Sequence, residues 1–188
     1  MRFAFFTTLF AYATVGLLQL VAASPILDTK DMIRRDNSDI MAVMTNLNQT
    51  VGGILKQMDD LVDSKQVNIA TITPLVTQLN AALLGGASDL SKLSPASLRR
   101  RQSDDQIAQI TADIVSSMAN TLGAVDSAAG LPILGGLLPG IDTSLNQVLL
   151  GLSILLQGVL RLVANLLSNV ARLLRNLALG LSLGTLGL

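Results

Sequence analysis

The side chains best suited to chemistry in this chain are aspartate, arginine and asparagine, because the sequence contains no histidine and no cysteine. That composition removes the usual general base, the usual metal ligands and the thiol nucleophile. The aspartates include the adjacent pairs Asp59-Asp60 and Asp104-Asp105. Adjacent residues on a helix point about 100° apart, so each pair suits helix-end solvation better than acid-base catalysis. We therefore expect no enzymatic activity, no catalytic residue, no metal site and no cofactor.

A repeat of arginine and asparagine marks the Leu-rich C-terminal third. The pair Arg161 and Asn165 returns eleven residues later as Arg172 and Asn176. Eleven residues are close to three helical turns, so the repeat keeps one polar stripe along a helix. The predicted polar edge consists of Arg161, Asn165, Arg172, Arg175 and Asn176. The predicted apolar face consists of Leu145, Val148, Leu152, Leu155, Val159, Leu162, Leu166, Val170, Leu173 and Leu177.

These stripes predict one long amphipathic helix over about 142–179, capped by Asp142 or Thr143 and stopped by Gly180. A membrane span needs roughly 20 mostly apolar residues, but arginine at the centre of a bilayer costs about 2.5 to 3.5 kcal/mol. The pattern equally suits a helix lying in a membrane interface or a core helix covered by partners. The wide leucine side and the apolar tail favour contact with lipid, another apolar surface or a second copy of the protein.

The N-terminus has the pattern of a secretory signal peptide. Arg2 precedes a long apolar run that ends in small residues, and we predict removal of residues 1–23 by cleavage between Ala23 and Ser24. An uncleaved N-terminal anchor is the alternative. After cleavage the protein would be secreted, outside the cell or in the cell wall, without disulfides.

Basic clusters divide the rest of the chain. The pair Arg34-Arg35 would end a pro-segment over 24–35, and the cluster Arg99, Arg100 and Arg101 would separate a helical segment over 36–101 from another over 102–188. Polar, turn-prone flanks make both clusters candidates for proteolytic processing. Cleavage after Arg101 would release a C-terminal product beginning at Gln102. The alternative is an exposed basic linker between two halves of one bundle.

Apolar spacing predicts three further helices and so an all-α helical bundle. The first is capped near Ser38 or Asp39, and Gly52-Gly53 interrupts its apolar stripe. That stripe consists of Ile40, Met44, Leu47, Val51, Ile54, Met58 and Leu61. The second helix begins at the Thr73-Pro74 cap and ends at Gly85-Gly86, and the third runs from a Ser103 cap to Gly130. The stretch "LPILGGLLPG" then forms an apolar loop or hinge.

The sequence Asn48-Gln49-Thr50 is an N-glycosylation sequon in a chain predicted to be secreted. Asn48 follows Leu47, which belongs to the apolar stripe, so its side chain should point outward. We therefore expect Asn48 to be glycosylated.

The signal peptide, the early dibasic site, the absence of cysteine and the stretch "SDIMAVMTNLNQTVGGIL" together resemble small secreted fungal proteins. In particular, the first helix and the general plan resemble the hydrophobic surface-binding protein and cell-wall galactomannoprotein family. It implies an all-helical bundle, adsorption to apolar surfaces and, in some members, fatty-acid binding. The C-terminal third, with its spaced arginines, departs from that family.

From these patterns we predict a secreted, non-enzymatic protein that adsorbs to hydrophobic or membrane surfaces through 142–179. A soluble lipid or fatty-acid carrier is one alternative, and the precursor of a membrane-active product cleaved after Arg101 is another. The expected partners are an apolar surface, a membrane interface or lipid, and further copies of the chain. The formal net charge of +0 argues against a nucleic-acid partner.

Overall fold

The computed structural model describes residues 29–93, 101–129, 134–156 and 158–188, with side chains within 38–93, 104–129, 134–156 and 158–188. The described residues form helices and no strand, which confirms the predicted all-α fold. The helices are α1 (Thr29–Asp63), α2 (Ile69–Ser91), α3 (Arg101–Ala129), α4 (Leu138–Leu155), α5 (Val159–Leu167), α6 (Ala171–Asn176) and α7 (Gly180–Leu186). Contacts divide the chain into Met1–Met32 and Ile33–Leu188, and α2 to α7 lie within the second unit together with α1 from Ile33 onward.

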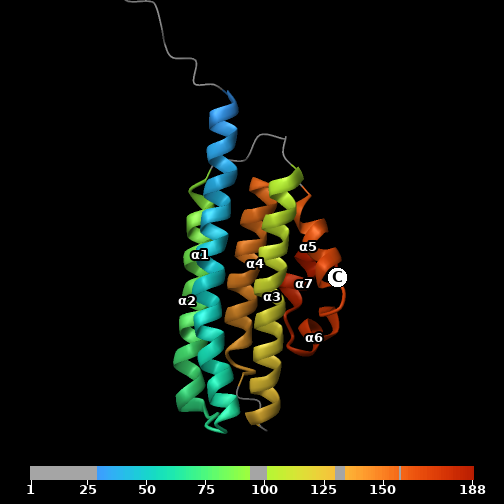
Figure 1. The fold of residues 1–188 in the computed structure, drawn as a ribbon. Coiled ribbons are helices and arrows are strands. Elements are labelled where there is room, and N and C mark those ends of the chain that lie inside the picture. The colour runs from blue at the N-terminus through green and yellow to red at the C-terminus, as the bar shows by residue number, and fades with distance from the viewer. Residues whose placement is uncertain (1–28, 94–100, 130–133, 157) are drawn as a thin grey trace, which may run out of the picture. The chain divides into compact units, whose positions relative to one another are not determined.

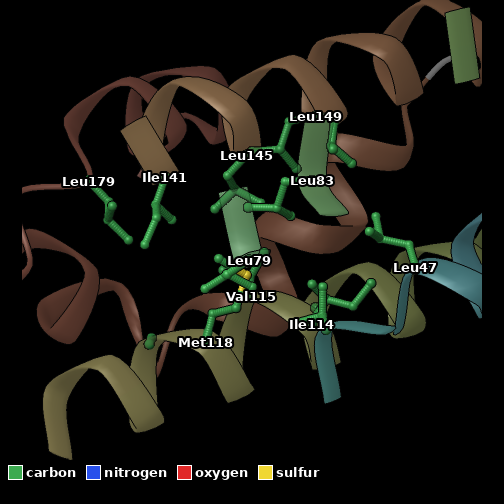
Figure 2. Packing of buried hydrophobic residues seen from close by; sticks show 14 of the residues in the cluster. Leu47, Leu79, Leu83, Ile114, Val115, Met118, Ile141, Leu145, Leu149 and Leu179 are labelled. Carbon is green, nitrogen blue, oxygen red and sulfur yellow. The ribbon is translucent and has the colours of Figure 1, made fainter. Parts of the chain in front are cut away.

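The four longer helices form a bundle in which α1 and α3 run in one direction and α2 and α4 run in the other (Figure 1). Helix α2 packs against α4, and the C-terminal helices pack on the opposite side of α4, with α5 against α3 and α7 against α4. Leucine, isoleucine, valine and methionine side chains from every helix meet in one apolar core. Figure 2 shows Leu79 of α2 between Leu145 of α4 and Met118 of α3, and Leu83 of α2 close to Leu145.

Helix α1 carries the predicted apolar stripe. Ile40, Met44 and Met58 are fully buried, and the stripe residues between them are buried too. Leu61, at the end of the stripe, is partly exposed. The predicted start near Ser38 was wrong, because α1 already begins at Thr29. Gly52 and Gly53 do not interrupt the helix. They lie on its exposed side, where each costs only about 1 kcal/mol relative to alanine, less than the packing of the stripe provides.

Helix α2 begins earlier than predicted, so the expected Thr73-Pro74 cap was wrong. Asn68 forms a reciprocal cap with Thr71: the Thr71 backbone N–H donates to Asn68 Oδ1 at 3.0 Å, and the Asn68 N–H donates to Thr71 Oγ1 at 3.1 Å. This capping box satisfies two backbone donors at the helix start. Pro74 therefore lies inside α2.

The predicted stop at Gly85-Gly86 was also wrong, because α2 continues to Ser91. Gly86 is buried against α1, where a Cβ atom would lie 2.9 Å from Leu47 Cδ2. Its missing side chain lets the two helices approach closely. Gly85 faces open space instead.

Helix α3 closely matches the predicted 103–130, and Ile107, Met118 and Leu122 lie in the core. Within the predicted hinge, residues from Leu134 onward form a turn that leads into α4 at Leu138. Pro139 fits the first turn because its missing N–H would have no partner there. The predicted start of this helix at Asp142 or Thr143 was therefore wrong.

The single long helix over 142–179 was wrong as well, because the chain forms α4, α5 and α6 over this range, and α7 follows them. Gly158 adopts a left-handed conformation with φ of 87°, which separates α4 from α5. Ala178 has φ of 56° and lies between α6 and α7. These breaks fold the apolar side of the segment back onto α3 and α4, where Val163 and Leu183 are buried. One straight helix would carry that side beyond the bundle.

Candidate surface-binding site

The ten residues of the predicted apolar face do not form one exposed surface. Leu145, Val148, Leu152, Leu155, Val159 and Leu177 are buried in the core. Leu162, Val170 and Leu173 are partly exposed, and Leu166 retains 44% of its surface exposed. This placement corrects the expectation of a continuous binding face. Helical periodicity identified the apolar side correctly, but α2, α3 and α7 cover most of it.

The predicted polar edge does lie at the surface. Arg161 and Asn165 are exposed on α5, and Arg172, Arg175 and Asn176 are exposed on α6. Among the described side chains, Lys92 forms an ion pair with Asp89, but no acidic side chain forms an ion pair with Arg161, Arg172 or Arg175. Although α5 and α6 are separate helices, both turn their arginines away from the core.

Several large apolar side chains are exposed on the described surface: Ile69, Leu84, Leu150, Ile154, Leu166 and Leu181. Leu150 and Ile154 lie one turn apart on α4, so they share a face of that helix. Ile154 is the most exposed of the set, at 68%. Both residues belong to the wide leucine side of the C-terminal third, so sequence periodicity did not distinguish them as a separate exposed pair.

A polar contact fixes α7 to α4. The buried Asp142 carboxylate accepts hydrogen bonds from the backbone N–H of Leu181 (2.9 Å) and the backbone N–H of Ser182 (2.9 Å). The Ser182 hydroxyl also donates to Asp142 Oδ1 at 2.7 Å, and Thr185 donates to Asn146 one turn further along. Asp142 therefore caps α7 rather than its own helix. Ser182 is fully buried, so this pair suits a structural contact rather than nucleophilic chemistry.

A shallow groove of about 180 Å³ lies between α1 and α2. Its lining residues are Val43, Asn46, Leu47, Thr50, Ala82, Gly85, Gly86 and Asp89. The groove is smaller than the roughly 300 to 1,000 Å³ of ordinary ligand pockets, and polar side chains contribute to its wall. It therefore offers little support for the alternative of an acyl-chain carrier.

Asn48 lies on α1, and its side chain is partly exposed. Thr50 of the same sequon donates its hydroxyl to the carbonyl oxygen of Asn46 at 3.0 Å. The glycosylation of Asn48 stays a prediction.

The two acidic pairs differ in their surroundings. Asp59 and Asp60 are both exposed near the end of α1, whereas Asp104 is partly buried near the start of α3. Burial, and then the neighbouring charge of Asp105, raises the pKa of Asp104 above its usual 3.8. Among the described residues, no three acidic side chains gather as a metal site would require.

The predicted processing positions lie at the margins of the described chain. Ala23, Ser24, Arg99 and Arg100 are outside the described residues. Helix α1 includes Arg34 and Arg35, and α3 begins at Arg101. Cleavage after Arg35 would therefore require the first turns of α1 to unwind, because proteases prefer exposed, irregular chain.

A membrane span within the predicted helix 142–179 would have to lie between Asp142 and Arg161, before the first arginine. It conflicts with the end of α4 at Leu155 and the turn through Gly158. In the part of the chain that the structure describes, α2 alone is long and apolar enough to cross a membrane. Length and composition do not separate a span from a core helix, and Leu79, Leu83 and Leu90 of α2 are fully buried in the bundle.

Comparison with protein-family models finds no match to this chain, and comparison with curated proteins finds no significant match. The resemblance to the fungal surface-binding family therefore stays a prediction.

Proposed function

We propose that the protein is a secreted, non-enzymatic helical bundle that adsorbs to hydrophobic or membrane surfaces by opening. In solution the helices cover one another's apolar sides. At an apolar surface the bundle opens, and the same sides lie against the surface while each helix stays folded. The observation that carries this proposal is the scarcity of polar contacts between the helices.

The helices are joined mainly by non-directional apolar packing. Apart from Ser38, the described side chains form hydrogen bonds within their own helix or its adjoining turn, with one exception. The exception is the set of hydrogen bonds that joins α4 to α7. The buried Thr111, for example, donates to Ile107 O of its own helix at 2.7 Å. Separating α2 from α4 therefore breaks no described side-chain hydrogen bond between them, although the apolar contacts are lost.

An apolar surface can replace those contacts. Burial of apolar area is worth about 25 cal/mol per Å², whichever apolar material covers it. The helices also keep their backbone hydrogen bonds when they separate, because each N–H pairs with a carbonyl of the same helix. Opening at an oil or lipid surface thus exchanges one apolar neighbour for another. Opening in water would expose the same leucines at full cost.

On an uncharged apolar surface such as an oil droplet, exposed apolar residues provide the first contact. Leu150 and Ile154 project from α4 before any opening, so the folded bundle can touch an apolar surface through this pair. A substitution of both by glutamine should slow adsorption without disturbing the core. Gln147 and Thr143 on the same exposed side of α4 show that polar residues are tolerated there.

The test measures adsorption and opening together. Because the chain has no cysteine, spin labels can be attached to cysteines introduced at the exposed positions Gln78 of α2 and Gln147 of α4. Triolein droplets should bind the protein, lengthen the distance between the labels and leave the helical circular dichroism intact. Adsorption with an unchanged label distance, or no adsorption, would overturn the proposal.

A further inference from the structure

We propose that the outer face of α5 and α6 docks on anionic phospholipid bilayers before the bundle opens. This arginine face consists of Arg161, Asn165, Leu166, Arg172 and Arg175. The inference rests on the proposed function, because it specifies the membrane and the side of the protein that first meets it.

Charge is divided unequally over the molecule. From residue 134 to the C-terminus the charged residues are Asp142, Arg161, Arg172 and Arg175, and Asp142 is buried as the cap of α7. The exposed side-chain charge of this part is therefore entirely positive. The remaining described side chains, within 38–93 and 104–129, include nine aspartates and three lysines. An anionic surface would attract the α5–α6 side and repel much of the rest.

Packing against α3 fixes which side of α5 and α6 faces outward. Val159, Val163 and Leu167 of α5 are fully buried, and Arg161 lies on the opposite side of the helix. On α6, Leu173 points toward Gly123 of α3, where a Cβ atom would lie 3.1 Å from Leu173 Cδ1. Figure 1 shows α5 and α6 beside α3, at the margin of the bundle.

The spacing within each helix groups the polar side chains. Arg161 and Asn165 are four residues apart on α5, and Arg172 and Arg175 are three apart on α6, so each pair shares a face. All four are exposed. The face therefore presents its cations without rearrangement of the fold.

An exposed apolar side chain on the same helix as Arg161 and Asn165 favours a bilayer over a soluble polyanion. Leu166 is 44% exposed on α5, and the partly exposed Leu162 lies one turn before it. Helices that lie in a membrane interface typically carry cations on their polar side and leucines on another side. Nucleic acid would favour aromatic stacking, and the segment from 134 to the C-terminus contains no aromatic residue.

The main experiment compares two charge-matched variants of the full chain. One replaces Arg161, Arg172 and Arg175 by glutamine, and the other replaces Lys56, Lys65 and Lys92 by glutamine, so both lose three positive charges. Flotation with phosphatidylcholine vesicles, with and without an equal part of phosphatidylglycerol, measures binding. We expect the arginine variant to lose roughly 100-fold in partitioning to the anionic vesicles, which corresponds to about 1 kcal/mol per charge. The lysine variant should bind like the parent.

A second pair tests the apolar contact. Leu166→Gln should weaken binding to the anionic vesicles several-fold, whereas Leu84→Gln on α2, where the side chain is 42% exposed, should leave it unchanged. Arg161→Lys with Arg172→Lys and Arg175→Lys should preserve binding. Added salt should weaken the binding of the parent protein.

Equal losses in the arginine and lysine variants would overturn the arginine face as the docking site. Binding to dextran sulfate without binding to anionic vesicles would overturn a bilayer as the partner. Adsorption to triolein distinguishes docking through the arginine face from opening of the bundle, because docking requires the arginine charges and opening does not. The arginine variant should therefore still adsorb to triolein, and its failure to do so would contradict a role confined to docking.

Discussion

The carboxylate of Asp142 in α4 caps α7 by accepting a hydrogen bond from the backbone N–H of Ser182, which lies 40 residues later in the chain. Helix α7 is short and has no cap from its own preceding residue, Leu179. A helix of this length is unstable in isolation. Its position therefore depends on Asp142 and on burial of Leu183 and Leu186.

Replacing Asp142 with alanine should lower the free energy of unfolding by about 1 to 3 kcal/mol, because buried N–H groups lose their acceptor. Hydrogen exchange should show a larger loss of protection in α7 than in α2. Thr143→Ala is the control, since the exposed Thr143 donates within its own helix to Pro139 O. Equal effects of the two substitutions would contradict the role of Asp142 as a cap.

The contact between Gly86 and Leu47 leads to a prediction about neighbouring glycines. Gly85→Ala should raise the free energy of unfolding by about 0.5 to 1 kcal/mol, because alanine favours a helix and the site is open. Gly86→Ala gains the same helix preference but forces the buried Leu47 to move. Urea denaturation should therefore rank Gly85→Ala above Gly86→Ala. Equal stability of the two would show that helix spacing does not depend on this glycine.

A substitution at Gly158 tests why the helix breaks between α4 and α5. Gly158 has a φ of 87°. Any other residue at this position would have to adopt the left-handed conformation, which costs about 1 to 2 kcal/mol. Gly158→Ala should therefore destabilise the protein in thermal or urea unfolding. Gly184→Ala inside α7, at an open position without positive φ, should not. A stabilising effect of Gly158→Ala would indicate that α4 and α5 prefer to join.

Asp104 supplies a prediction about pH. Its pKa is raised by burial first and by Asp105 second, so Asp105→Asn should lower the pKa of Asp104 but leave it above 3.8. Titration of the side-chain carboxyl by NMR measures this change. An unchanged pKa would exclude the contribution of Asp105.

The raised pKa of Asp104 also makes the stability of the fold depend on pH. The folded protein holds the Asp104 proton more tightly than the unfolded chain does, so this group favours folding most at low pH. Its contribution is present below the unfolded value near 3.8 and is lost as the pH rises through the raised folded value. Asp104→Asn should remove this part of the pH dependence of urea unfolding.

The apolar stripe of α1 could be predicted because each helical turn repeats the same local information. Ile40, Met44 and Leu47 follow the helical period, and all three are buried. The breaks and caps could not be predicted in the same way. Gly86 had the pattern of a helix stop, yet its role depends on Leu47 in another helix, and Asp142 bonds to a residue far along the chain.

The candidate site could likewise be predicted only in part. Periodicity placed Arg161, Arg172 and Arg175 on the polar side of their helices, and these residues are exposed. Periodicity also placed Leu152 and Val159 on the apolar side, but it carried no information about the helices that cover them. Whether an apolar side lies in the core or at the surface depends on tertiary packing.

The central claim is that the bundle opens when it adsorbs. Its most direct test is to measure adsorption with and without a reversible cross-link between α2 and α4. A Cβ atom at Gly151 would lie 3.4 Å from Leu90 Cβ, close to the roughly 3.5 to 4.5 Å of disulfides. The chain has no other cysteine to compete, so Leu90→Cys with Gly151→Cys can be studied oxidised and reduced. The two forms have the same sequence, which controls for the loss of Leu90.

Binding isotherms on triolein droplets, recorded for both forms of this variant, provide the decisive comparison. If α2 and α4 must separate, the reduced protein should adsorb strongly and the oxidised protein at least tenfold more weakly, and reductant added to the oxidised protein should restore adsorption. Equal adsorption of the oxidised and reduced forms would contradict opening of the bundle.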